Sequence, residues 1–322
     1  MTITRRHLLV ASGGAALVSS AFSQAFPSKP IKLIYTYAAG GSGDALPRAA
    51  AASMSSYLGQ QVVVENRAGG SGSIGLQAVW RAAPDGHTLV VTTITTVVQY
   101  PLLTKDTTFD PVRTMTPLYN LAMNPLVLLV HPSVPVHDFP SFVEWARKQP
   151  GGVDVAVSGP TLEVASALLG MRANLKLNNI KYRGGAPALQ AVLGGEPKVF
   201  FDAANAGLIS NAQAGKLKVV GVTSAEPSPL LSDAVPIAKH LPGFVQDINF
   251  AVWGPPGLPA DVAARLRDAL ARSMAEPDMK DKLFKAGLVL APAGPDAVTS
   301  MTLREAAAIK GAMELAPISY GT

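Results

Sequence analysis

The chain has 322 residues, a formal net charge of +5 and no cysteine. The lack of cysteine excludes disulfides, thiolate metal sites and a cysteine nucleophile. The charge is modest, and no run of lysines or arginines is interleaved with aromatic residues, which argues against a nucleic-acid partner.

Residues 1–25 have the features of an export signal. Arg5 and Arg6 precede an apolar stretch, 8–18, which is too short for a permanent membrane anchor. Ser23-Gln24-Ala25 then fits the small-x-small pattern that signal peptidase cleaves. The paired arginines favour the twin-arginine route, with the general secretory route as the alternative. We therefore expect cleavage after Ala25 and a periplasmic mature protein.

Apolar, β-rich runs alternate with helical segments along the mature chain. This alternation predicts an α/β fold with parallel sheets and crossover helices, and the length suits two domains. The stretch 261–275 has an apolar residue at every fourth position, which predicts a helix with one face on the core. The predicted strands are 32–37, 62–65, 88–93, 126–131, 153–157, 198–202, 217–223 and 250–254.

Five segments rich in glycine and hydroxyl residues follow predicted strands. In an open α/β sheet, ligands bind beyond the carboxyl ends of the strands. Glycines at a strand-to-helix turn also let backbone N–H groups approach an anion closely. Each segment alone is equally compatible with an ordinary turn, but together they favour a receptor for a small anion. The segments are 40–43, 69–73, 92–96, 158–161 and 183–187.

Enzymatic signatures are weak or missing. Residues 70–75 match the G-x-G-x-x-G pattern, but the next strand, 88–93, lacks the terminal acid that would hold a ribose. No two histidines of the mature chain have the spacing of a helix-borne metal pair. The chain also has no P-loop and no G-x-S-x-G elbow. We therefore expect no catalytic residue, no metal and no cofactor.

An ordered series of motifs covers nearly all of the mature chain. These are Pro27-Ser28-Lys29-Pro30-Ile31, Ala39-Gly40-Gly41-Ser42-x-Asp44, Leu58-Gly59-Gln60-x-Val62-Val63-Val64-Glu65-Asn66-Arg67, Ala82-Ala83-Pro84-Asp85-Gly86, Tyr182-Arg183-Gly184-Gly185-Ala186-Pro187-Ala188 and Ala214-Gly215-Lys216-Leu217. With these motifs the chain resembles the Bug-type extracytoplasmic solute receptors, the periplasmic binding proteins of tripartite tricarboxylate transporters. The resemblance implies a two-domain, type II (flytrap) periplasmic-binding-protein fold with a ligand cleft between the domains. Residues 26–124 with 247–322 would form domain 1, and residues 125–246 domain 2.

The resemblance also implies where a ligand carboxylate would bind. The loop 39–44 and Ser73 would hold it from domain 1, and Thr161 with the turn 184–186 would close over it from domain 2. Arg48, Lys181 and Arg183 are expected to be solvated or structural. The expected ligand-binding residues are Tyr37, Ala39, Gly40, Gly41, Ser42, Asp44, Ser73, Thr92, Thr95, Ser158, Thr161, Gly184, Gly185, Ala186 and Asp202.

Some positions depart from the family pattern. Ala38, Gly43 and Ser73 stand where proline, threonine and asparagine are common, and the segment 158–164 is shorter and lacks a histidine. Glu163 either faces the cleft, where it would repel a second ligand carboxylate and favour an amine or amide, or it lies outside the pocket in the first turn of a helix.

These features predict a monomeric periplasmic receptor that binds a small carboxylate or amide solute. It would deliver the solute to the membrane permease subunits of a tripartite transporter. Two alternatives stay open at this point. One is a binding domain that signals to a membrane sensor, and the other is an exported enzyme whose reactive groups lie far apart in the sequence.

Overall fold

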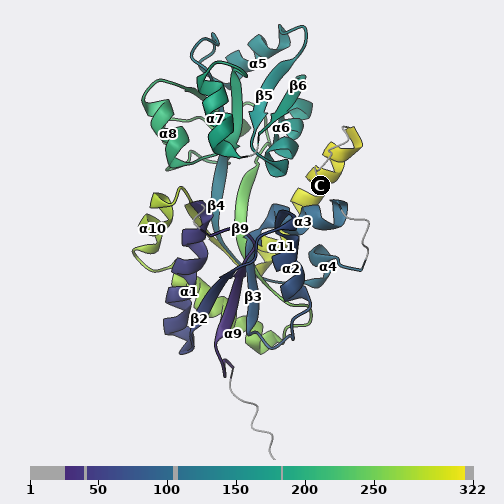
Figure 1. The fold of residues 1–322 in the computed structure, drawn as a ribbon, viewed down its shortest axis with the longest axis vertical. Coiled ribbons are helices and arrows are strands. Elements are labelled where there is room, and N and C mark those ends of the chain that lie inside the picture. Colours follow the sequence, from purple (N-terminus) through teal and green to yellow (C-terminus); the bar gives the residue numbers. More distant parts are fainter. Residues whose placement is uncertain (1–25, 40–41, 104–107, 183, 316–322) are drawn as a thin grey trace, which may run out of the picture.

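The computed structural model describes residues 26–39, 42–103, 108–182 and 184–315. The chain forms two lobes, and two long strands run between them (Figure 1). β4 (Thr116–Val130) leads from the first lobe into the second, and β9 (Asp247–Gly254) leads back. The expected leader, residues 1–25, lies outside the described residues. Within the described residues, every helix is too short or too polar to span a membrane.

The first lobe has a mixed sheet. β1 (Ile31–Tyr35) lies between β2 (Val62–Asn66) and β3 (Thr88–Thr93) and is parallel to both. β9 is antiparallel to β3 and to the first half of β4, and β10 (Val289–Ala293) pairs antiparallel with β4. The helices of this lobe are α1 (Ala45–Leu58), α2 (Ser73–Trp80), α3 (Ile94–Leu103), α4 (Pro111–Thr114), α9 (Ala260–Met274), α10 (Met279–Lys285) and α11 (Pro295–Leu315).

The side chains of β1 show that helices cover both faces of this sheet. Ile31, Leu33 and Tyr35 pack in a cluster with residues of α1, α9 and α10. Ile34 points to the other face and packs with residues of α2 and α3. All four side chains are buried, as expected for a strand with a two-residue period in a sheet covered on both faces.

The second lobe has its own parallel strands. β5 (Val153–Val157) is parallel to β6 (Leu177–Lys181) and to β7 (Val199–Ala203). β7 and β8 (Lys218–Val222) both pair antiparallel with the second half of β4. The helices of this lobe are α5 (Phe139–Arg147), α6 (Pro160–Ala173), α7 (Gly185–Leu193) and α8 (Ala206–Gln213).

β4 changes partners within one residue. Pro125 is the last residue of β4 opposite β9, where it faces Asp247. The next residue, Leu126, is already opposite Ala203 of β7. On β4, the change from pairing with β9 to pairing with β7 therefore takes a single residue step. β9 begins at the same level, with Asp247.

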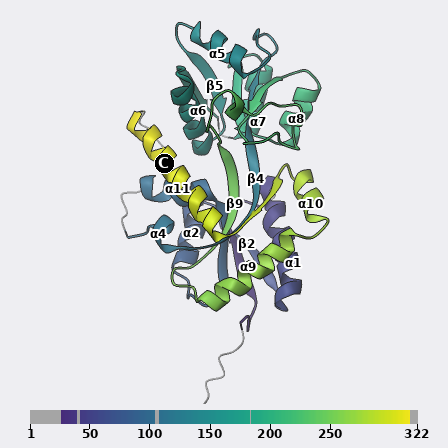
Figure 2. The ribbon, with the colours of Figure 1, turned by 180° about the vertical axis from the view of Figure 1, so that it is seen from behind.

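α11 is a further link between the lobes. It starts in the first lobe, packs along α3, and then contacts α6 of the second lobe (Figures 1 and 2). Ile309, in its second half, is buried in a cluster that contains residues of both lobes.

Each of the eight predicted strands overlaps a strand of the structure, and the α/β flytrap fold is confirmed. β3 and β5 have the predicted bounds, and the predicted helix 261–275 is α9, whose fourth-residue stripe is buried. The prediction of parallel sheets was wrong in part, because β4, β8, β9 and β10 make antiparallel pairs. The chain crosses between lobes on extended strands, which forces these pairs. β6, β10 and the first half of β4 were not predicted.

Candidate functional site

Three loops of the first lobe meet at one edge of its sheet. β1, β2 and β3 are parallel, so their carboxyl ends lie side by side. The Tyr37 hydroxyl, after β1, lies 2.8 Å from Thr93 Oγ1 and 2.8 Å from Thr96 Oγ1, at the end of β3 and in α3. Asn66, at the end of β2, donates from Nδ2 to the carbonyl oxygen of Tyr37 at 3.1 Å. The loops therefore form one hydroxyl-rich surface.

Thr92 supports this surface from below. It is fully buried, and its hydroxyl lies 2.7 Å from that of Thr36. Gly72 packs directly on Thr36 and Thr96, because a Cβ at this position would come within 2.7 Å of Thr96 Cγ2 and 3.3 Å of Thr36 Cβ. Its φ of +91° also lies in the region that favours glycine. The 69–73 loop thus depends on a glycine at position 72.

Asp44, at the start of α1, is held by the side chains of Arg48 and Asn66. Arg48 donates from Nε to Asp44 Oδ2 at 3.0 Å and from Nη2 to Oδ1 at 3.1 Å. Arg48 Nη2 also donates to Asn66 Oδ1 at 3.0 Å, and Asn66 Nδ2 donates to Asp44 Oδ1 at 2.9 Å. This closed network ties the first loop to β2, so Arg48 is structural, as expected from the sequence.

The second lobe places a buried carboxylate beside two of its loops. Asp202, at 5% exposure, accepts a hydrogen bond at Oδ1 from its neighbouring backbone N–H of Ala203 at 2.7 Å. Its Oδ2 has no hydrogen-bond partner among the described residues. A Cβ on Gly185, the first residue of α7, would lie 3.0 Å from that oxygen. Burial raises the pKa of Asp202, and the nearby Ser158 hydroxyl and the backbone N–H of Ala203 oppose the rise.

Glu163 lies in the first turn of α6 and is not a free charge. Its Oε2 is 2.8 Å from Lys181 Nζ of β6, and its side chain is mostly buried. The expected position in the first turn of a helix is observed, and a location outside the pocket stays a prediction. Pairing with Lys181 also offsets the repulsion that a ligand carboxylate would meet.

Thr95 and Thr161 lie between the lobes. Together with Asp247 and Glu305 they line a cavity of about 20 Å³, which is large enough for about one water molecule. Thr95 Oγ1 donates a hydrogen bond to Glu305 Oε1. Burial raises the pKa of Glu305 to about 7, and Thr95 opposes the rise; burial likewise raises the pKa of Asp247 to about 6, opposed by Thr223. Neither carboxylate was predicted as a site residue from the sequence.

The predicted ligand residues that the structure describes thus fall into three groups. Gly40 and Gly41 lie outside the described residues, and so does Arg183. At the edge of the first lobe are Tyr37, Ala39, Ser42, Asp44, Ser73 and Thr92. At the edge of the second lobe are Ser158, Gly184, Gly185, Ala186 and Asp202, and between the lobes are Thr95 and Thr161. Sequence reasoning missed Thr36 and Thr96, whose contacts depend on strand register.

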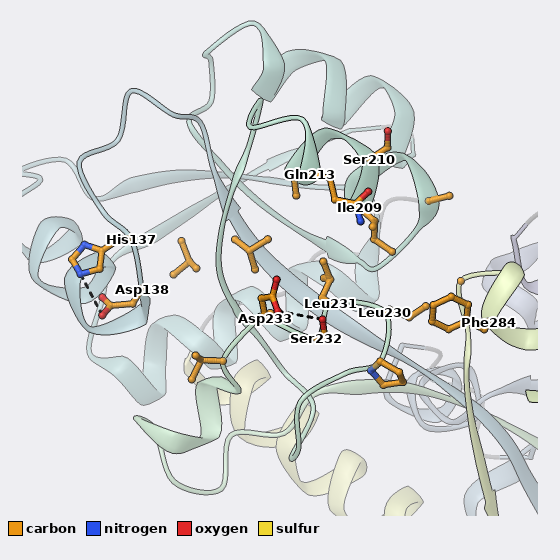
Figure 3. A pocket seen from close by; sticks show the side chains of 18 of the residues that line it. His137, Asp138, Ile209, Ser210, Gln213, Leu230, Leu231, Ser232, Asp233 and Phe284 are labelled. Atoms are coloured by element: carbon orange, nitrogen blue, oxygen red, sulfur yellow. Dashed lines mark hydrogen bonds and ion pairs between the residues drawn. The ribbon is translucent and has the colours of Figure 1, made fainter. Parts of the chain in front are cut away.

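A separate cavity of about 680 Å³ lies away from these loops (Figure 3). Ile209 of α8, Leu230 and Leu231 line it, and Phe284 of α10 lies at one side. His137 and Asp138, 3.6 Å apart, lie at the other side. None of the predicted ligand residues lines this cavity.

Comparison with known proteins identifies the family. Residues 46–307 match the tripartite tricarboxylate transporter family receptor, TctC. The chain belongs to this family. It is 33% identical to a UPF0065 protein of Pseudomonas sp. (strain P51) over 93% of this chain and 90% of that protein. Protein BugT of Bordetella pertussis is 29% identical over 78% of this chain and 77% of its own length.

Solved structures of similar proteins have the same fold. A TctC solute binding protein from Polaromonas, solved without ligand, has a TM-score of 0.80 at 27% identity, over 90% of this chain and 99% of that chain. An R. palustris protein with adipate has a TM-score of 0.73 at 26% identity, over 90% and 97%. The resemblance to Bug-type receptors is confirmed, and the chain is a periplasmic solute-binding receptor of the TctC family.

Proposed function

We propose that this receptor captures one small carboxylate-bearing solute between its lobes and delivers it to the permease subunits of a tripartite transporter. The observation that carries the proposal is the convergence of loops rich in N–H and O–H donors at the facing edges of the two lobes. Thr95 and Thr161 line one cavity, which brings the end of β3 close to the end of β5. A solute bound there would touch both lobes.

Backbone groups would supply the positive potential for the solute carboxylate. α1 and α2 begin at the first-lobe loops, and α6 and α7 begin at the second-lobe loops. The N–H groups at a helix start carry partial positive charge and favour an anion. The nearby cations Arg48 and Lys181 already bind Asp44 and Glu163. An arginine clamp is therefore not part of the proposal.

Asp202 would set the chemistry at the opposite end of the solute. Its buried Oδ2 lacks a donor among the described residues, and leaving such an acceptor unpaired costs about 1–3 kcal/mol. A solute with an amide or amine at that end would supply the missing hydrogen bond, whereas a second carboxylate would meet a like charge. We therefore favour a carboxylate that also carries a donor, such as a monoamide.

The proposal includes the export and the division of the chain. The leader 1–25 would direct export, by the twin-arginine route, with cleavage after Ala25. Domain 1 would contain 26–124 with 247–322, and domain 2 would contain 125–246. The change of partners on β4 at Pro125 supports this division. A role in signalling to a membrane sensor uses the same closure and remains the alternative.

Thermal unfolding of the mature protein with three matched solutes tests the proposal. These are adipate, its monoamide and its diamide, which share one chain length. A solute at 100 times its Kd should stabilise the fold by about 2.7 kcal/mol. When all three solutes are compared at one concentration, we expect the monoamide to stabilise the fold most and the diamide least. If these three solutes and a wider set of carboxylates and amides all leave the melting temperature unchanged, the receptor proposal is wrong. Reconstituted uptake with the permease subunits then separates transport from signalling.

A further inference from the structure

Two partly buried carboxyl groups lie at the junction of the lobes. Asp247 begins β9, the strand that returns from the second lobe, and Glu305 lies on α11. Both line the cavity of about 20 Å³ that also contains Thr95 and Thr161. Both also line a groove of about 660 Å³ between α6 and α11. The pair therefore separates the inter-lobe cavity from a wider groove.

The position of α11 links this pair to the arrangement of the lobes. α11, which contains Glu305, packs on α3 of the first lobe and on α6 of the second lobe (Figures 1 and 2). A rotation of the second lobe must therefore shift α6 relative to Glu305. Thr161 begins the same helix, α6, and is one of the residues we expect at the solute. A change at Glu305 and a change at the cleft are thus mechanically connected.

No cation neutralises the pair directly. Among the described residues, neither Asp247 nor Glu305 has a basic group within ion-pair distance. Arg304 of α11 and Arg172 of α6 line the groove, and Arg172 donates to the carbonyl of Pro242 at 2.7 Å. Glu163 of α6 is paired with Lys181.

The remaining neighbours of α11 bring no further charge. α3 and β4 contain no charged side chain, and their titratable groups are Tyr100 and Tyr119. The Tyr100 hydroxyl accepts a hydrogen bond from Gln77, and Tyr119 packs in the cluster on the α1 and α9 side of the sheet. Two negative charges facing one cavity of this size are unfavourable unless one of them takes up a proton.

We propose that proton uptake by Glu305 and Asp247 holds α6 of the second lobe against α11 and so regulates the solute cleft. The effect on the cleft rests on the proposed function, whereas the effect on the lobes does not. Above the pKa values of the pair, the charged carboxylates gain by fuller contact with water, which a movement of α6 away from α11 would provide. Burial raises both values, to about 7 for Glu305 and to about 6 for Asp247, so the change should occur between neutral and mildly acidic pH.

A distance measurement without solute tests the effect on the lobes. The chain has no cysteine, so Met171→Cys on α6 and Leu303→Cys on α11 can carry two spin labels. Both positions are well exposed, at 41% and 58%. We expect the label distance to increase as the pH rises through about 7. The same transition in a Glu305→Gln background, or a constant distance in the parent, would overturn the proposal.

Two further variants sharpen the result. Asp247→Asn should reduce the transition because it removes the second charge. Glu163→Gln is the matched control, since it removes a carboxylate from α6 that is already paired with Lys181, and it should leave the transition in place. A transition lost in the control but kept in Asp247→Asn would contradict the assignment to the pair.

The link to the cleft is tested with a solute that thermal unfolding has identified, with adipate as the first probe. We expect the Kd to change at least tenfold between the two ends of the transition, and to stay constant in Glu305→Gln. A receptor whose label distance changes while its Kd does not would overturn regulation of the cleft. If no solute binds, the proposed function fails, and the label distances alone decide on the proton-dependent contact of α6 and α11.

Discussion

The guanidinium of Arg48 donates two hydrogen bonds, of 3.0 and 3.1 Å, to the carboxylate of Asp44, which lies one helical turn earlier in the chain. Because Asn66 joins both groups, the pair connects the beginning of α1 to the end of β2. Asp44 is thus held in place by protein groups and need not touch a ligand cation. A structural anchor of this kind affects binding through the geometry of the loop.

Asp44→Ala should weaken solute binding by about 1–3 kcal/mol, because it removes the carboxylate to which both Arg48 and Asn66 donate. Titration calorimetry measures the loss, and circular dichroism confirms folding. Asp268→Ala is the matched control, since Asp268 and Arg272 form an exposed i,i+4 pair of the same residue types at 3.7 Å. Unchanged affinity in Asp44→Ala would mean that the loop does not contact the solute.

Gly72→Ala tests the packing of the 69–73 loop on the threonines. The new Cβ would press on Thr96 and Thr36 and would sit at a positive φ, so the loop should shift and solute affinity should fall at least tenfold. Gly59→Ala provides the control, because its φ is +67° and no atom lies within 4 Å of the new Cβ. It should lower the unfolding free energy by about 1 kcal/mol through strain alone and leave affinity intact. Equal affinities in both variants would contradict a role for the loop.

The sequence could predict the parts of the site that follow from local pattern. β3 and β5 have a strong apolar signal and occur at the predicted residues. Their parallel neighbours then bring the following loops to a common edge, as expected for strands of one sheet. β6 was missed because Asn178 and Asn179 interrupt its apolar pattern, and the residues of this strand are only partly buried or exposed.

Other features depend on contacts between distant segments. Thr92 and Thr95 belong to the same hydroxyl-rich run, but their contacts differ. Thr92 is hydrogen-bonded to Thr36 beneath the surface, and Thr95 is hydrogen-bonded to Glu305. Glu305 lies 210 residues from Thr95. No local pattern marks such a pair, because the contact exists only after α11 packs on α3.

Asp202→Asn tests the proposed recognition of a donor. The amide can both donate and accept, so the variant should lose preference for the adipate monoamide over adipate by at least tenfold in Kd, mainly by gaining affinity for the dicarboxylate. Asp154→Asn, an exposed position on the neighbouring strand β5, should keep the parent preference. An unchanged preference in Asp202→Asn would place the solute away from this carboxylate.

Replacing Arg5 and Arg6 by lysine tests the export route. A receptor that uses the twin-arginine route should then accumulate in the cytoplasm with its leader uncut. Immunoblots of periplasmic and cytoplasmic fractions distinguish the two forms by size. Normal processing of the variant would instead assign the leader to the general secretory route.

The pH dependence of stability provides an independent test of the raised pKa of the Glu305 carboxyl group. Burial raises the pKa of Glu305 from the ordinary value of 4.5 to about 7, so the folded protein retains a proton that the unfolded chain has already released. The free energy of unfolding should therefore fall as pH rises from about 4.5 to about 7 and should then level off. Glu305→Gln cannot ionise, and it should be more stable than the parent above pH 7 by about 1–3 kcal/mol. Urea unfolding at both ends of this range measures the difference. A parent and a variant with parallel stability curves would show that the Glu305 carboxyl group is hydrated in the folded protein.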